Sequence, residues 1–119
     1  MQRRPLWNQQ ESFVKRNVGR TVVFEIQGQL IVGNRQQFKR EVLLALHAGT
    51  PRIVIDFSRT TFIDSSGLGV LITISKEIRA AGADLRLAAL SRELHGLLAL
   101  TRLDTFFRIA HDLEEALED

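Results

Sequence analysis

The chain has 119 residues, 45% of them hydrophobic and 25% charged, which are ordinary values for a single globular domain. Its formal net charge is only +2 and no Lys/Arg cluster alternates with aromatic residues, so nucleic-acid binding is not expected. The absence of cysteine excludes disulfides and thiolate metal sites and fits a cytoplasmic protein, while no apolar run approaches the ~20 residues needed for membrane insertion.

The first eleven residues differ from the rest of the chain. Residues 1–11 lack hydrophobic periodicity, so we expect a flexible N-terminal arm ahead of one domain that spans residues 12–119. The arm starts with basic residues but has no apolar core, and so does not match a signal peptide. Trp7 is expected either to anchor this arm on the domain or a partner, or to belong to a disordered tail.

Two strands are expected at the start of the domain. The first is a short strand over residues 12–16, and the second covers residues 21–27. Apolar side chains alternate along the second strand, as in a half-covered sheet: Val22, Phe24 and Ile26. Val23 adds an apolar residue to the opposite face. Gly28 is expected to end the strand.

The middle of the chain predicts a helix, a central strand and a second helix. Residues 34–48 have helical spacing and are followed by a Gly-Thr-Pro stop, while residues 52–57 are apolar on both faces. Residues 66–81 form the second predicted helix. The buried sides of the two helices are expected to consist of Phe38, Val42, Ala45 and Leu46 in the first and Leu68, Leu71, Ile72, Ser75 and Ile78 in the second.

The last third of the chain continues the alternation of strands and helices. A strand is predicted over residues 84–90, followed by a short helix capped by Ser91. A final strand over 105–109 and a final helix over 112–117 complete the pattern. This order indicates an α/β fold, in which a mixed, largely parallel sheet of about five strands packs with about four helices.

The segment between the central strand and the second helix is the most informative. It reads Asp64-Ser65-Ser66-Gly67-Leu68-Gly69 and places two hydroxyls and a carboxylate at a helix start. The first N–H groups of a helix lack partners within it, so these side chains are natural caps, and the same end favours a phosphate. The segment therefore predicts either a helix cap or a phosphorylation site, and its glycines are expected to allow close packing of helix on strand.

Catalytic and metal sites have little support in the sequence. A serine hydrolase would need Gly-x-Ser-x-Gly, but Ile63 and Asp64 stand where the first glycine would precede Ser65 or Ser66. The Walker pattern and His-x-x-x-His are absent, and no carboxylate is spaced to orient His47, His95 or His111. We therefore expect no enzyme activity, no bound metal and no cofactor, with a small serine hydrolase as the least favoured hypothesis.

The Asp-Ser-Ser-Gly-Leu-Gly segment resembles the signature of STAS domains, and within them that of bacterial anti-sigma factor antagonists. The resemblance covers about residues 12–117. It includes the apolar strand 53–57 before the segment, Gly28-Gln29-Leu30 before the first helix, residues 82–85 and residues 103–109. The six-residue string is quite specific, whereas the other matches are individually loose.

The resemblance implies a regulatory protein that is switched by phosphorylation. The family's acceptor is the residue after the aspartate, here Ser65, with Ser66 the second choice because it is expected to cap the helix. The implied partners are an anti-sigma factor serine kinase, which the unphosphorylated form binds so that a sigma factor is released, and a serine phosphatase. The implied partner-binding residues are Leu30, Ile31, Asp64, Ser65, Ser66, Gly67 and Leu68.

One position departs from the family pattern. Family members commonly carry an acidic residue directly after Gly-x-Leu, where this chain has Ile31. The departure keeps open a second hypothesis, in which the chain is a STAS subunit of a lipid-transport ATPase or signalling assembly. Asp64 is equally open to two interpretations, a helix cap or a direct partner contact. The chain is expected to be a monomer or a homodimer.

Overall fold

A five-stranded sheet forms the centre of the molecule. The computed structural model describes residues 13–118, so the predicted arm and Trp7 lie outside the described residues. The strand order is β1-β2-β3-β4-β5, and only the β1–β2 pair is antiparallel, which confirms the predicted mixed, largely parallel sheet. The elements are β1 Phe13–Val18, β2 Thr21–Leu30, α1 Arg35–His47, β3 Arg52–Ile63, α2 Ser65–Ala80, β4 Asp84–Ala88, α3 Arg92–Leu100, β5 Arg108–Ala110 and α4 Leu113–Ala116.

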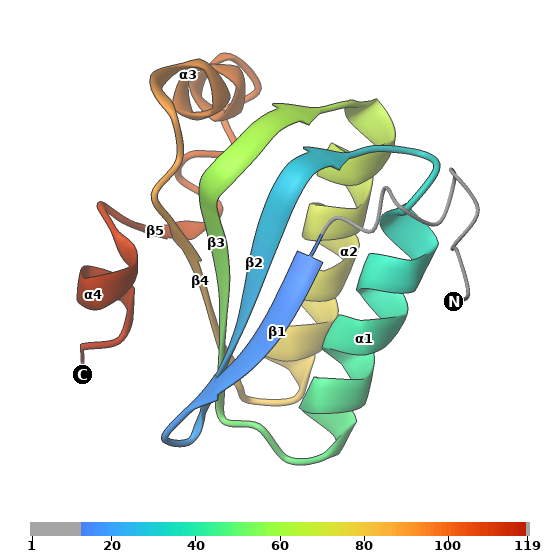
Figure 1. Ribbon diagram of the computed structural model, residues 1–119, viewed down its shortest axis with the longest axis vertical. Helices are drawn as coiled ribbons and strands as arrows, with labels where there is room; N and C mark the ends of the chain where they lie inside the picture. Colours follow the sequence, from blue (N-terminus) through green and yellow to red (C-terminus); the bar gives the residue numbers. More distant parts are fainter. Residues whose placement is uncertain (1–12, 119) are drawn as a thin grey trace, which may run out of the picture.

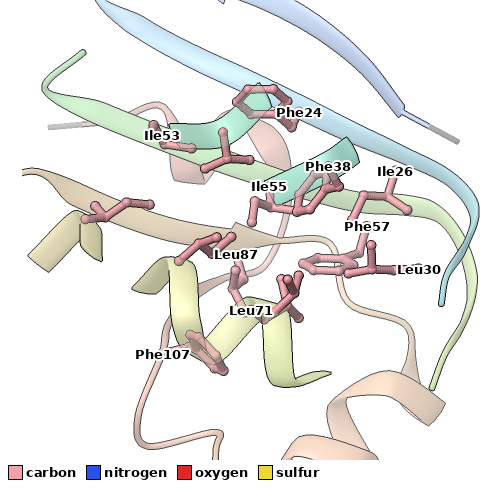
Figure 2. Close-up of a cluster of buried hydrophobic side chains, with 14 of the residues drawn as sticks. Phe24, Ile26, Leu30, Phe38, Ile53, Ile55, Phe57, Leu71, Leu87 and Phe107 are labelled. Carbon is pink, nitrogen blue, oxygen red and sulfur yellow. The ribbon is translucent and has the colours of Figure 1, made fainter. Parts of the chain in front are cut away.

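The main core lies between the sheet and helices α1 and α2, which run side by side on one face (Figure 1). Phe24, Ile55 and Leu87 from three neighbouring strands face Phe38 of α1 and Leu71 of α2 (Figure 2). Each of these side chains is essentially fully buried, and burying one contributes about 1.5–3 kcal/mol to folding. The four α1 residues predicted to be buried are the four that the structure buries.

A smaller core on the opposite face of the sheet explains why Val23 interrupts the alternation of β2. Val23, Val54, Ala88 and Ala110 form this cluster with Ala116 of α4, which lies on that face (Figure 1). The central strands are therefore covered on both faces. This explains why their sequences are apolar on both faces.

Strands β2 and β3 are both longer than predicted. Gly28 does not end β2; it adopts φ +92° at a register irregularity, and pairing continues to Leu30. β3 continues beyond residue 57 to Ile63, because its pairing with β2 continues to Leu30, and the hydroxyls of Thr60 and Thr61 add hydrogen bonds of 3.0 and 2.9 Å to carbonyls of β2. The extension brings the ends of both strands to the segment that precedes α2.

The buried stripe of α2 is rotated from the predicted one. The structure buries Val70 and Ile74, whereas Leu68 and Ile72 are half-buried at its edge. The stripe that contacts the sheet starts at Gly67 and follows the i, i+3, i+4 spacing: Gly67, Val70, Leu71, Ile74, Ser75 and Ile78. The sequence pattern missed this rotation because α2 is apolar over most of its circumference.

The two C-terminal strands are shorter than, or shifted from, the predicted ones. β4 ends at Ala88 because Ala89 has φ +60°, which takes the chain out of the extended conformation. β5 covers Arg108–Ala110 instead of 105–109, since residues 101–106 form turns after α3. The predicted N-cap Ser91 is confirmed, as its side chain accepts from the N–H of Leu94. The last helix begins one residue later than predicted, at Leu113, and Asp112 is its N-cap, accepting from the N–H of Glu115.

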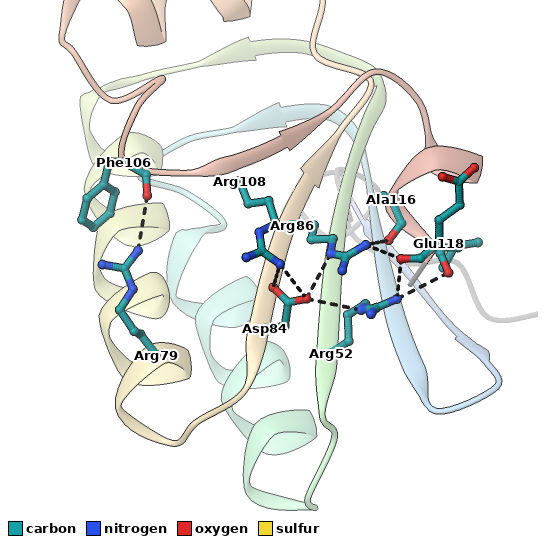
Figure 3. A network of polar contacts seen from close by, with 9 residues as sticks. Arg52, Arg79, Asp84, Arg86, Phe106, Arg108, Ala116 and Glu118 are labelled. Carbon is teal, nitrogen blue, oxygen red and sulfur yellow. Dashed lines mark hydrogen bonds and ion pairs between the residues drawn. The ribbon is translucent and has the colours of Figure 1, made fainter.

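An arginine cluster around Asp84 connects the starts of β3, β4 and β5 to the chain end (Figure 3). Nitrogens of Arg52, Arg86 and Arg108 lie 3.4, 3.0 and 3.3 Å from the Asp84 carboxylate. Arg52 and Arg86 also donate to backbone carbonyls between Ala116 and Glu118. These contacts hold α4 against the smaller core, at the end of the sheet opposite the start of α2.

Candidate functional site

The Asp-Ser-Ser-Gly segment lies where β3 ends and α2 begins, beside the loop that follows β2 (Figure 1). Because β2 and β3 are parallel, their last residues, Leu30 and Ile63, are register partners. The N–H of Asp64 donates to the Leu30 carbonyl at 3.2 Å. The fold thus brings together the two segments in which partner-binding residues were predicted.

Asp64 caps α2 and also holds the loop after β2. Its Oδ1 accepts from the Gly67 N–H at 2.8 Å, and its Oδ2 accepts from the Val32 N–H at 3.1 Å. The hydrogen bond from Gly67 is the main cause of a lowered Asp64 pKa; partial desolvation opposes it, and the N–H groups of Val32 and Ser66 and the positive charge of Arg35 lower the pKa further. The carboxylate is therefore ionised at neutral pH.

This lowered pKa predicts how the stability of an Asp64→Asn variant depends on pH. Asp64→Asn should be less stable than wild type at neutral pH, because a neutral amide accepts hydrogen bonds less strongly. The folded-state pKa lies below the unfolded one, so the carboxylate's contribution is complete above the ordinary carboxyl range and is lost as pH falls through the folded pKa. Urea midpoints of the two proteins should therefore converge in acid. A gap that stayed constant from neutral to acid pH would contradict this assignment.

Gly67 permits the close approach of α2 to the end of β2. A Cβ atom at this position would lie 2.3 Å from the Leu30 carbonyl oxygen and 3.0 Å from Cγ2 of Ile63. The expectation that the glycines allow close helix-on-strand packing is confirmed for Gly67. It is wrong for Gly69, where a Cβ would meet nothing within 4 Å.

The two serines of the segment differ in exposure. Ser65 is the first residue of α2 and is exposed, whereas Ser66 is half-buried. Ser66 was expected to cap the helix, and this is wrong, because Asp64 occupies the N-cap and Ser66 is the second helical residue. Ser65 is thus the more accessible hydroxyl, at the positive end of a sixteen-residue helix.

The remaining predicted partner-binding residues divide into buried and accessible ones. The side chain of Leu30 is only 1% exposed and belongs to the main core, and Gly67 is buried against it. Ile31 and Leu68 are half-exposed beside Asp64 and Ser65. Leu30 and Gly67 therefore support the site from the core. Only the other predicted residues offer surface to a partner: Ile31, Asp64, Ser65, Ser66 and Leu68.

Three residues near the site did not stand out in the sequence. The side chains of Val32 and Phe62 are 62% and 50% exposed, on the two segments that Asp64 joins. Arg35, the first residue of α1, acts electrostatically on Asp64. Phe62 could have been noticed because it precedes Ile63, so that two neighbouring apolar residues in a strand must face opposite sides of the sheet. The proximity of Arg35 to Asp64 has no local signal.

The part of the chain that the structure describes contains neither a cluster of metal-ligating side chains nor a helix that could span a membrane. Within residues 13–118, no three His, Asp or Glu side chains are grouped so that they could hold a metal ion. None of the helices in that range combines the length and the apolar character needed to cross a bilayer. The three histidines are all exposed, in α1, in α3 and just after β5.

Comparison with known proteins finds relatives and solved structures that share this fold. A Thermotoga maritima protein named as a candidate anti-sigma factor antagonist is 32% identical over 92 residues, which cover 76% of this chain and 81% of that protein. The crystal structure of such a candidate antagonist from the same organism matches with a TM-score of 0.83 and 29% identity, covering 88% of this chain and 91% of the other.

The anti-sigma factor antagonist SpoIIAA has the same fold in two states. Its unphosphorylated form matches with a TM-score of 0.71 and 25% identity, covering 87% of this chain and 92% of SpoIIAA. The phosphorylated form of the Bacillus protein gives 0.70 and 26%, covering 87% and 95%. Residues 12–116 of the present sequence match the STAS domain family, and because this match spans most of the sequence, the chain belongs to that family.

Proposed function

We propose that this chain is an anti-sigma factor antagonist whose binding is controlled by phosphorylation of Ser65. In this proposal the unphosphorylated protein binds an anti-sigma factor serine kinase in the cytoplasm and thereby releases a sigma factor. The kinase supplies ATP and Mg²⁺, a serine phosphatase reverses the modification, and the chain itself acts as a non-catalytic binding module. The observation that carries the proposal is an exposed Ser65 hydroxyl at the start of α2, next to an ionised Asp64.

The physical argument for a switch rests on where the new charge is placed. A phosphate adds about −1.5 to −2 charges at neutral pH, and at a helix N-terminus this is mildly stabilising, by about 0.3–1 kcal/mol. A partner docked over Ser65 would have to desolvate or repel the same charge, which costs several kcal/mol. Phosphorylation should therefore release the partner while the fold persists.

The surroundings of Ser65 suit a protein partner. Val32 and Phe62 expose much of their apolar side chains on the two segments joined through Asp64, and Ile31 and Leu68 on the same segments are half-exposed. Apolar side chains around a polar switch residue are typical of interface centres, where burial of apolar area supplies affinity. A kinase that recognises this surface would place its active site over Ser65.

The direct test is phosphorylation by the anti-sigma factor kinase of the same organism. Wild-type protein incubated with this kinase and Mg-ATP should carry one phosphate on Ser65, located by peptide mass spectrometry. Ser65→Ala should carry none. The matched variant Ser66→Ala should still be modified, because it keeps the exposed Ser65 and loses only the half-buried hydroxyl. Phosphate on Ser66, or no phosphate on the wild type, would exclude Ser65 as the acceptor.

One observation favours a second candidate function. Ile31 stands where the family commonly has an acidic residue, and the structure places it half-exposed beside the Asp64 segment. A site without that acid suits a partner other than the kinase, such as the other subunits of a lipid-transport ATPase. In that case the chain should co-purify with a membrane ATPase and remain unphosphorylated in cells.

A further inference from the structure

Arg35 is held close to the Ser65 segment by a compact loop. The loop after β2 is closed by the Asn34 side chain, whose Oδ1 accepts from the Ile31 N–H at 2.9 Å. The N–H of Arg35 donates to the Ile31 carbonyl at 3.0 Å, and the intervening Val32 N–H is bound by Asp64. The start of α1 is thus tied to the start of α2 through residues that are fixed by hydrogen bonds on both sides.

The guanidinium group of Arg35 is incompletely satisfied in this position. Its Nε is buried and has no hydrogen-bond partner among residues 13–118. Arg35 acts on Asp64 through charge, but the hydrogen bonds that hold the Asp64 carboxylate come from the N–H groups of Gly67, Val32 and Ser66. A buried donor without a partner is costly, so an anion that reached the guanidinium group would gain a charge-assisted hydrogen bond.

A phosphate on Ser65 would arrive next to a carboxylate that is already negative. Two like charges within about 4–6 Å disfavour each other's ionised form, so Asp64 alone would oppose the dianionic phosphate. Arg35 is the cation that already acts on Asp64, and Lys39 lies one turn further along α1. A planar guanidinium group matches two phosphate oxygens, which a lysine ammonium does not.

We propose that Arg35 is the intramolecular receptor for the phosphate of phosphorylated Ser65, forming an ion pair that joins the starts of α1 and α2. The inference rests on the proposed function, since it concerns the phosphorylated state of the same site. The ion pair would offset the repulsion from Asp64 and would cover part of the docking surface. Arg35 is thereby a positioning residue of the phosphorylated form and has no catalytic part.

The test measures the second ionisation of the phosphate by ³¹P NMR. Phosphoserine is installed at position 65 during translation, so that no kinase is needed and failure of this inference is distinguishable from failure of the proposed function. In the folded wild type, the second phosphate pKa should lie about one unit below that of the same protein in urea. Arg35→Gln should remove most of this shift, and Arg35→Lys should keep part of it.

The control is Arg40→Gln, which removes an exposed arginine from another face of α1 and should leave the phosphate titration unchanged. Equal phosphate pKa values in the folded wild type and Arg35→Gln would overturn the inference. If Arg35→Gln folds poorly, Arg35→Lys provides the comparison: its phosphate pKa should lie above that of the wild type, and an equal value would overturn the inference.

Discussion

Phosphorylation of Ser65 is expected to weaken binding of the anti-sigma factor kinase at least about 100-fold while leaving the protein folded. At the exposed start of α2 the phosphate changes the stability of the fold only mildly. In a docked interface the same charge must be desolvated or repelled, which costs several kcal/mol of binding free energy. Since every 1.4 kcal/mol is tenfold in affinity, about 3 kcal/mol suffices. Calorimetric titration of the kinase with the two forms measures the ratio, and thermal unfolding of each form alone measures stability.

A matched pair of variants tests whether the loss of binding depends on where the negative charge is placed. Ser65→Glu should reproduce part of the loss. Thr73→Glu introduces the same charge at an exposed position about 12 Å further along α2, beyond a Debye length, and should bind almost normally. If phosphorylated Ser65 bound the kinase as tightly as the unmodified residue, or if its Tm fell markedly, the proposed switch would be wrong.

Gly67→Ala is expected to lower the free energy of unfolding by about 1–3 kcal/mol, although alanine is the better helix former. The added Cβ would meet the Leu30 carbonyl oxygen at 2.3 Å, and this is backbone that cannot rotate away. The same carbonyl accepts from the Asp64 N–H, so moving it would also disturb the junction between β3 and α2. Urea unfolding measured by circular dichroism gives the change directly.

Gly69→Ala provides the control for Gly67→Ala. Gly69 lies two residues away in the same helix, it is exposed, and a Cβ there meets nothing within 4 Å. This substitution should therefore stabilise the protein by up to about 1 kcal/mol through helix propensity alone. If both variants were stabilised equally, the close contact between Gly67 and Leu30 would not constrain the fold.

Periodicity predicted well wherever an element has one clear apolar face. The buried residues of α1 follow from helical spacing, and the β2 residues that enter the main core follow from alternation, because both patterns depend only on residues near one another in the sequence. It predicted poorly where apolar residues surround an element or run past its end. In α2 the packing against the sheet decides which of the apolar residues are buried. β4 ends before Ala89 because that residue has a positive φ.

For the site, the sequence by itself determined the location of an aspartate and two serines at a strand-to-helix junction and the family that they resemble. Caps and hydroxyl positions are local properties, so a short segment carries them. The register of parallel strands decided the rest, because it joins residues far apart along the chain, as in the hydrogen bond from Val32 to Asp64 across 32 positions. Four features of the site depend on the tertiary structure alone. They are the burial of Leu30, the need for a glycine at position 67, the exposure of Phe62 and the position of Arg35 near Asp64.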